Sequence, residues 1–137
     1  RLTGETVTVA SGVGVNSVSS GIPVSVDATG QIAYRTGEVA SQTLLTWMDR
    51  SGETKGTIGA SDMKPSNPRV SPDGRRVAVD RVAQKDADIW LVGASRLERL
   101  TFTASEDERP LWSPDGAQIF YRARSADGSH LYRQSAS

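Results

Sequence analysis

The sequence has no cysteine, few aromatic residues and no excess of charge of either sign. The absence of cysteine from its 137 residues excludes disulfides, thiolate zinc sites and a cysteine nucleophile. The 16 basic and 16 acidic residues give a formal net charge of zero, whereas nucleic-acid-binding domains and polybasic membrane-surface modules carry net positive charge. No apolar run approaches the ~18 residues that span a bilayer. We therefore predict neither nucleic acid nor membrane as a partner.

Helical periodicity is also lacking. No window of about ten residues places apolar side chains at helical spacing, and the segments between glycines and prolines are short. Several of them instead alternate apolar and polar residues, which is typical of half-buried strands. Examples are residues 6–9, 75–79 and 118–121. These features predict an all-β fold.

A repeated Ser-Pro-Asp-Gly segment is the most informative pattern in the chain. Residues 71–74 recur as residues 113–116, which lie 42 positions later. A degenerate copy at residues 27–30 lies 44 positions before residues 71–74. Trp90 and Tyr132 show the same 42-residue spacing. A period of about 40–45 residues with four strands in each unit is typical of the blades of a β-propeller. We predict four-stranded antiparallel blades, with strands a to d running outward from a central channel.

The chain is predicted to form one domain, residues 1–137, that holds three blades' worth of strands. The predicted units are an orphan outer strand at residues 1–10, blade 1 at 22–59, blade 2 at 67–102, and blade 3, which lacks its outer strand, at 109–134. Three blades do not close a ring, because propellers contain about 4–8 blades. We therefore expect a homodimeric six-bladed ring with strand exchange, in which residues 1–10 complete the third blade of the other copy. The competing interpretation is an excised half of a longer propeller.

Three runs of sequence carry a family resemblance. NPRVSPDGRRVAV and RPLWSPDGAQIFY resemble the repeats of TolB-like propellers. The longer run from TGETVTVASGV to RLTF resembles the propeller attached C-terminally to some bacterial Ser/Thr protein kinases. The resemblance implies a bacterial protein of sensory or scaffolding type in the periplasm or another extracytoplasmic compartment. The motif is specific for the fold and not for an activity, because this architecture carries many functions.

The connections on one face of the predicted disc are longer and more charged than those on the other. Loops held on a rigid scaffold commonly carry recognition. We predict a non-catalytic module that binds a protein or peptide through this loop-rich face and the channel mouth, with no cofactor and no metal. The residues expected to contact the ligand are Asp62, Lys64, Asn67, Arg69, Glu106, Glu108 and Arg109.

Two other functions remain open. A metal-dependent propeller hydrolase or lactonase would need convergent acidic, Asn or His side chains on the innermost strands, where the sequence offers little beyond Asn67 and Glu108. The third interpretation is a fragment without a selected ligand.

Several residues have a simpler structural interpretation. We expect Asp73 and Asp115 to serve as turn residues, since Ser, Pro, Asp and Gly suit successive positions of a tight turn. Trp47, Trp90 and Tyr132 are interpreted as one packing position in each blade. Trp112 is expected in the core and His130 at a solvent-exposed edge. Residues 104–109 are expected to form a solvated charged loop.

Overall fold

The computed structural model describes residues 8–11, 13, 24–36, 43–61, 64–83 and 85–137. In those residues the chain forms strands and no helix, which confirms the predicted all-β class, and it contains no membrane-spanning helix. The strands are β1 (Val24–Val26), β2 (Ile32–Thr36), β3 (Leu44–Met48), β4 (Thr54–Ile58), β5 (Ser66–Val70), β6 (Val77–Val82), β7 (Ala87–Val92), β8 (Leu97–Arg99), β9 (Glu106–Trp112), β10 (Gln118–Ser125) and β11 (Gly128–Ser135). Residues 8–11 have no regular structure, and the rest of the predicted outer strand at 1–10 lies outside the described residues.

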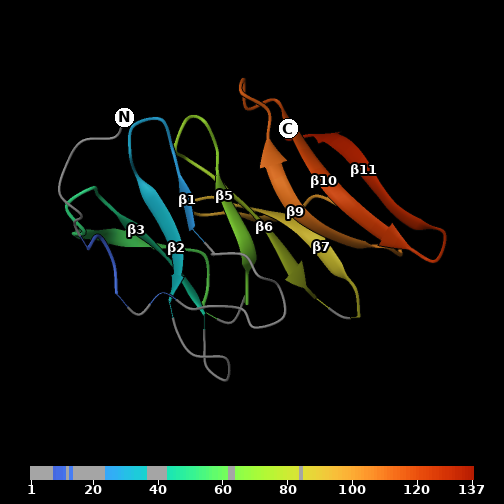
Figure 1. The fold of residues 1–137 in the computed structure, drawn as a ribbon, viewed down its shortest axis with the longest axis horizontal. Helices are drawn as coiled ribbons and strands as arrows, with labels where there is room; N and C mark the ends of the chain where they lie inside the picture. The colour runs from blue at the N-terminus through green and yellow to red at the C-terminus, as the bar shows by residue number, and fades with distance from the viewer. Residues whose placement is uncertain (1–7, 12, 14–23, 37–42, 62–63, 84) are drawn as a thin grey trace.

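The strands form three antiparallel sheets, each a simple meander along the chain. The sheets are β1-β2-β3-β4, β5-β6-β7-β8 and β9-β10-β11, and they follow one another across Figure 1. The first strands of the sheets are neighbours, because β5 lies against both β1 and β9. One face of the molecule, called here the turn face, carries the β5–β6, β7–β8 and β9–β10 turns. The opposite face, called here the loop face, carries the starts of β5 and β9 and the ends of β6 and β10.

Each Ser-Pro-Asp-Gly segment forms the predicted turn between the first two strands of its sheet. The Ser71 hydroxyl donates to Asp73 Oδ1 at 2.5 Å and accepts the backbone N–H of Arg76 at 2.9 Å. The Gly74 N–H donates to the Ser71 carbonyl at 2.9 Å. Residues 113–118 repeat these bonds at the same distances. The aspartates therefore serve as local hydrogen-bond acceptors that fix the turns.

The two turn glycines offer a matched stability test. Gly74 and Gly116 share a φ of 71°, so alanine at either position costs about 1 kcal/mol in backbone strain. A Cβ on Gly74 would also lie 2.7 Å from Asp27 Oδ2, whereas a Cβ on Gly116 would meet nothing closer than 3.6 Å. We expect Gly74→Ala to destabilise the chain more than Gly116→Ala in urea denaturation. Equal losses would contradict the contact between the first two turns.

The first sheet corrects one predicted alignment. Its turn is one residue shorter, because the Asp27 N–H bonds to the carbonyl of Gln31, whereas the Ser71 N–H bonds to that of Arg76. Ala33 consequently pairs with Trp47 where Ala78 pairs with Leu91. Trp47 thus corresponds to Leu91. The prediction that Trp47 and Trp90 share one position is wrong, because a shift of one residue moves a side chain to the other face of a strand.

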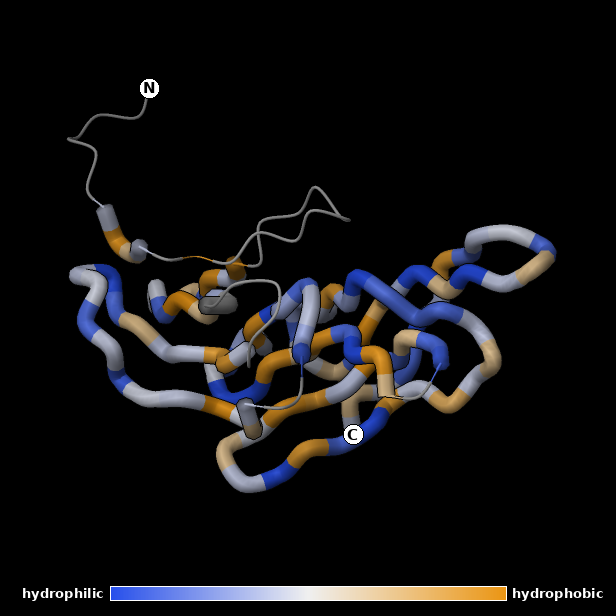
Figure 2. The backbone as a smooth tube through the Cα atoms, turned by 90° about the horizontal axis from the view of Figure 1, so that it is seen from below, coloured by the Kyte–Doolittle hydropathy of each residue, from blue (hydrophilic) through white to orange (hydrophobic). Residues whose placement is uncertain are grey.

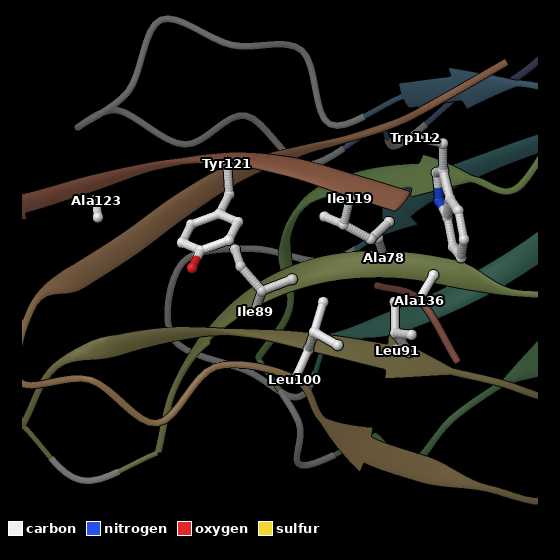
Figure 3. Packing of buried hydrophobic residues seen from close by; sticks show 9 residues of the cluster. All are labelled: Ala78, Ile89, Leu91, Leu100, Trp112, Ile119, Tyr121, Ala123 and Ala136. Atoms are coloured by element: carbon white, nitrogen blue, oxygen red, sulfur yellow. The ribbon is translucent and has the colours of Figure 1, made fainter. Parts of the chain in front are cut away.

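Two apolar clusters hold the sheets face to face. Trp47 and Trp90 pack on the first cluster, between sheets one and two, which contains Ala33, Leu45, Ile58, Val70, Val77, Val79 and Val92. The second cluster, between sheets two and three, contains Ala78, Ile89, Leu91, Leu100, Trp112, Ile119, Tyr121, Ala123 and Ala136 (Figure 3). Trp112 is therefore a core residue, as predicted, and its indole N–H donates to the Arg69 carbonyl at 2.9 Å. Figure 2 shows hydrophobic and hydrophilic segments alternating along the backbone.

The far face of the third sheet is open to solvent. Ile89 is 0% exposed beneath the third sheet, whereas Leu131, which lies 42 residues later, is 76% exposed. Leu111 on the same face is 58% exposed. Every residue of β11 is exposed, and His130 lies on this strand as predicted. Among the described residues no strand pairs with the outer edge of β11.

The predicted loop at residues 104–109 is wrong, because β9 already begins at Glu106. β10 extends to Ser125, which leaves a short hairpin turn before β11 begins at Gly128. The charged side chains are accommodated in strands because Glu106 pairs with Arg124 and Glu108 with Arg122 across the ladder.

Candidate binding face at the start of the inner strands

A β-bulge lies near the start of β5 and another near the start of β9. Ser66 pairs with Asp80 and Arg69 with Ala78, so three steps along β5 match two along β6. β9 has the same irregularity opposite β10. The extra residue of a bulge leaves the ladder and redirects nearby side chains. Both bulges lie at the loop face.

The bulges hold non-glycine residues in a left-handed backbone conformation. Asn67 has a φ of 46° and Arg109 a φ of 56°, and Lys64 just before β5 has a φ of 47°. Residues other than Gly rarely adopt this backbone conformation, which costs about 1–2 kcal/mol for an ordinary residue. Asn67 and Arg109 lie 42 residues apart, and each precedes a proline that restricts the backbone further.

The Asp80 carboxylate joins the two bulges. Its Oδ1 accepts Asn67 Nδ2 at 2.8 Å and the Arg109 backbone N–H at 3.0 Å. Burial raises the pKa of Asp80, the two hydrogen bonds oppose that rise, and the charge of Glu108 adds to it. The carboxylate therefore ties the second sheet to the third at the loop face. Sequence analysis missed Asp80, although a carboxylate directly after the apolar residues 77–79 is the available signal.

The structure places the other predicted site residues in different environments. Glu106 and Glu108 form ion pairs with Arg124 and Arg122 on the open face of the third sheet. Arg69 is partly buried, and its Nη1 donates to the carbonyl of the neighbouring Pro68 at 3.0 Å. Lys64 is exposed. Asp62 lies outside the described residues. Asn67 and Arg109 are thus the predicted residues that the fold brings together.

We expect Arg109→Gly to stabilise the chain by about 1 kcal/mol, because glycine adopts the left-handed conformation without strain. The Arg109 N–H bond to Asp80 needs no side chain and is retained. Thermal denaturation of the variant beside the parent chain measures the gain. A loss of stability would show that the Arg109 side chain compensates for its own backbone strain.

In the part of the chain that the structure describes, no group of three or more His, Cys, Asp or Glu side chains is placed to hold a metal ion.

Three meandering sheets, packed face to face with their first strands adjacent, are blades of a β-propeller. No family model matches the chain. In fold it is similar to the putative TolB from Agrobacterium tumefaciens, with a TM-score of 0.70 and 21% identity over 86% of this chain and 47% of that one. It is also similar to TolB from Acinetobacter baumannii, with a TM-score of 0.67 and 20% identity over 82% of this chain and 29% of that one.

The predicted resemblance to TolB-like propellers is therefore confirmed at the level of the fold. The chain spans 47% and 29% of the lengths of these two proteins. The resemblance to kinase-attached propellers stays a prediction.

Proposed function

We propose that the chain is a non-catalytic propeller module that binds a protein or peptide through its loop face and the channel mouth. The observation that carries this proposal is the pair of strained residues, Asn67 and Arg109, held at one repeat position by the buried Asp80 carboxylate. Backbone strain that the surrounding structure maintains is concentrated at functional sites.

The electrostatics of this face suit recognition better than proton transfer. Glu106 and Glu108 are neutralised by arginines, and Asp80 already accepts two hydrogen bonds. A catalytic acid or base needs a carboxyl group within reach of the substrate and free to exchange its proton.

Selection from a random peptide display library on the immobilised chain tests this function. We expect binders whose affinity falls about tenfold in Arg109→Glu, because reversal of an exposed charge on the loop face disturbs recognition. Arg96→Glu is the matched control, since Arg96 is exposed on the turn face. Binders whose affinity is the same for the parent chain and both variants, or a selection without binders, would contradict the proposal.

We further propose that a second copy of the chain covers the open face of the third sheet and completes a homodimeric six-bladed ring. The support comes from the repeat itself. The second sheet buries Ile89 beneath the next sheet, whereas the third sheet leaves Leu131 and Leu111 exposed beside the unpaired edge of β11. Exposed apolar faces and open edges favour association.

Light scattering after size-exclusion chromatography tests this assembly. We expect about twice the chain mass of 14.6 kDa for the parent chain, and a monomer for Leu131→Asp. His130→Asp, which places the same charged side chain at an exposed position of β11 on the opposite side of the strand, is the control and is expected to remain dimeric. A parent chain that is monomeric at every concentration would overturn the dimer.

A further inference from the structure

A cavity of about 340 Å³ lies between the third sheet and the connection from β8 to β9. It lies at the loop face, where β9 begins and β10 ends. Its lining includes Thr103, Ser105, Asp107, Tyr121, Ala123 and Tyr132. Tyr132 is half exposed, whereas Asp107 is fully buried. The Tyr121 and Tyr132 rings are stacked, with centroids 6.0 Å apart and planes at 23°.

Asp107 lines this cavity, and two hydroxyls cover its buried carboxylate. Thr103 Oγ1 donates to its Oδ2 at 3.0 Å and Ser105 Oγ donates to its Oδ1 at 2.8 Å. A carboxylate has about four acceptor positions, so these hydroxyls leave capacity for further donors. Within the described residues Asp107 forms no ion pair, whereas the buried Asp88 pairs with Arg99 at 2.7 Å. Together with burial, which is the larger cause, the charge of Asp107 raises the pKa of Tyr121.

In the second sheet, an arginine side chain lies at the position that corresponds to this cavity one repeat earlier. Val79 pairs with Trp90 as Tyr121 pairs with Tyr132, so the two sheets correspond at a 42-residue offset here. In the second sheet the Arg81 guanidinium carbon lies 4.9 Å from the centroid of the Trp90 ring.

Two substitutions distinguish the third sheet from the second. Ala123 stands where the second sheet has Arg81, and Asp107 stands where it has Pro65. The first substitution removes the guanidinium from the aromatic site, and the second adds a negative charge beside it. The third sheet thus retains the aromatic surface of a cation site and lacks the cation.

We propose that this cavity binds the side chain of an arginine from a protein or peptide partner. The guanidinium stacks on the tyrosine pair and donates to the Asp107 carboxylate, as its planar group of donors allows. Arginine fits better than lysine, because a planar cation both stacks on an aromatic ring and bonds a carboxylate through two N–H groups. The inference rests on the proposed function, since it names the chemistry by which the loop face recognises a partner.

Calorimetric titration with two acetylated and amidated tripeptides, Gly-Arg-Gly and Gly-citrulline-Gly, tests the cavity. Citrulline keeps the shape of arginine without its charge. We expect the arginine peptide to bind at least about tenfold more tightly, since a charge-assisted bond to a buried carboxylate contributes more than a neutral one. Equal affinity for the two peptides would overturn the proposal. So would tighter binding of free arginine than of the peptide, because that result would assign the cavity to a small molecule.

Ala123→Arg places in the third sheet the side chain that the second sheet already carries. We expect it to fill the cavity and to lower the affinity for the arginine peptide at least about tenfold, and its melting temperature shows that the variant is folded. Undiminished binding would overturn the proposal. Asp107→Asn is expected to weaken binding similarly, but its buried hydrogen bonds make Ala123→Arg the safer variant.

Arg81→Ala is the matched control in the second sheet. It exposes the Trp90 ring without supplying a carboxylate, because Pro65 stands where the third sheet has Asp107. We expect no second site of comparable affinity in this variant. Two equal sites would show that aromatic stacking alone binds the peptide and would overturn the role given to Asp107.

The display selection separates this inference from the proposed function. Selected peptides without arginine, whose binding is weakened by Arg109→Glu and not by Ala123→Arg, would leave the proposed function in place and overturn the arginine cavity. A selection without binders would contradict the proposed function, whereas the tripeptide titration would still decide whether the cavity takes a guanidinium.

Discussion

Ile89→Ala is expected to destabilise the chain by about 2–5 kcal/mol, the usual cost of removing most of a buried aliphatic side chain from a packed core. Ile89 is fully buried between the second and third sheets. Its cluster joins residues from both sheets, so the resulting cavity weakens the contact between two blades and not just one strand. Urea denaturation at low protein concentration measures the loss.

Leu131→Ala is the matched control for this variant, because Leu131 occupies the same position one repeat later. It is 76% exposed, so we expect a change within about 0.5 kcal/mol for the isolated chain. A large loss for Leu131→Ala in dilute solution, or a small one for Ile89→Ala, would contradict the placement of the core between the second and third sheets. Under conditions in which the proposed dimer forms, the cost of Leu131→Ala is expected to increase with protein concentration.

Asp80→Ala is expected to cost about 3 kcal/mol, because it leaves Asn67 Nδ2 and the Arg109 N–H without their shared acceptor. The stability lost in Asp80→Ala depends on pH, and the shift in the pKa of Asp80 determines the direction of this dependence. Burial raises this pKa above its ordinary value of 3.8, so ionisation is less favourable in the folded chain than in the unfolded one. The contribution of Asp80 to the free energy of unfolding is fully present below 3.8 and declines as the pH rises through the higher folded value. Asp80→Ala should therefore cost more near pH 4 than at pH 7.

Asp115→Ala is the control, because the stability lost in this variant is expected to change with pH in the opposite direction to that of Asp80→Ala. The Ser113 hydroxyl, followed by the Ala117 N–H, holds the pKa of Asp115 below its usual range. A lowered pKa contributes stability that is present above the ordinary value and is lost as the pH falls through the folded value. Denaturation of both variants and the parent chain at pH 4 and pH 7 compares the two slopes. Parallel pH dependence in the two variants would contradict the assigned environment of Asp80.

The repeat and the turn chemistry predicted most of the architecture. A 42-residue period with Ser-Pro-Asp-Gly at a fixed phase specifies the boundary between the first two strands of a blade, because the serine and aspartate side chains close that turn locally. The first copy of the repeat departs from this phase. Its turn has lost one residue, and the compensating change in register appears only when the partners of Ala33 and Ala78 are known.

The candidate site was predictable only in part, because its geometry depends on contacts between strands that are distant in sequence. Asn67 and Arg109 could be named from their places before the inner strands. Their connection through Asp80 could not, since it spans 13 residues to Asn67 and 29 to Arg109. The acidic run at residues 106–108 resembles a loop in sequence, because the arginines that neutralise Glu106 and Glu108 lie on the next strand. Charge in a strand is recognisable from sequence only when its cross-strand partner is known.

The shortened turn at residues 27–30 bears on any attempt to graft or recombine these blades. β2 and β3 keep their mutual pairing while both are displaced relative to the motif that precedes them. If blades were joined at a fixed number of residues after the motif, the strands would be displaced by one residue. An apolar surface would then face outward in the chimera. Junctions chosen by ladder partner, with Ala33 exchanged for Ala78 and Trp47 for Leu91, preserve the inward surface and allow the hairpin length to vary freely.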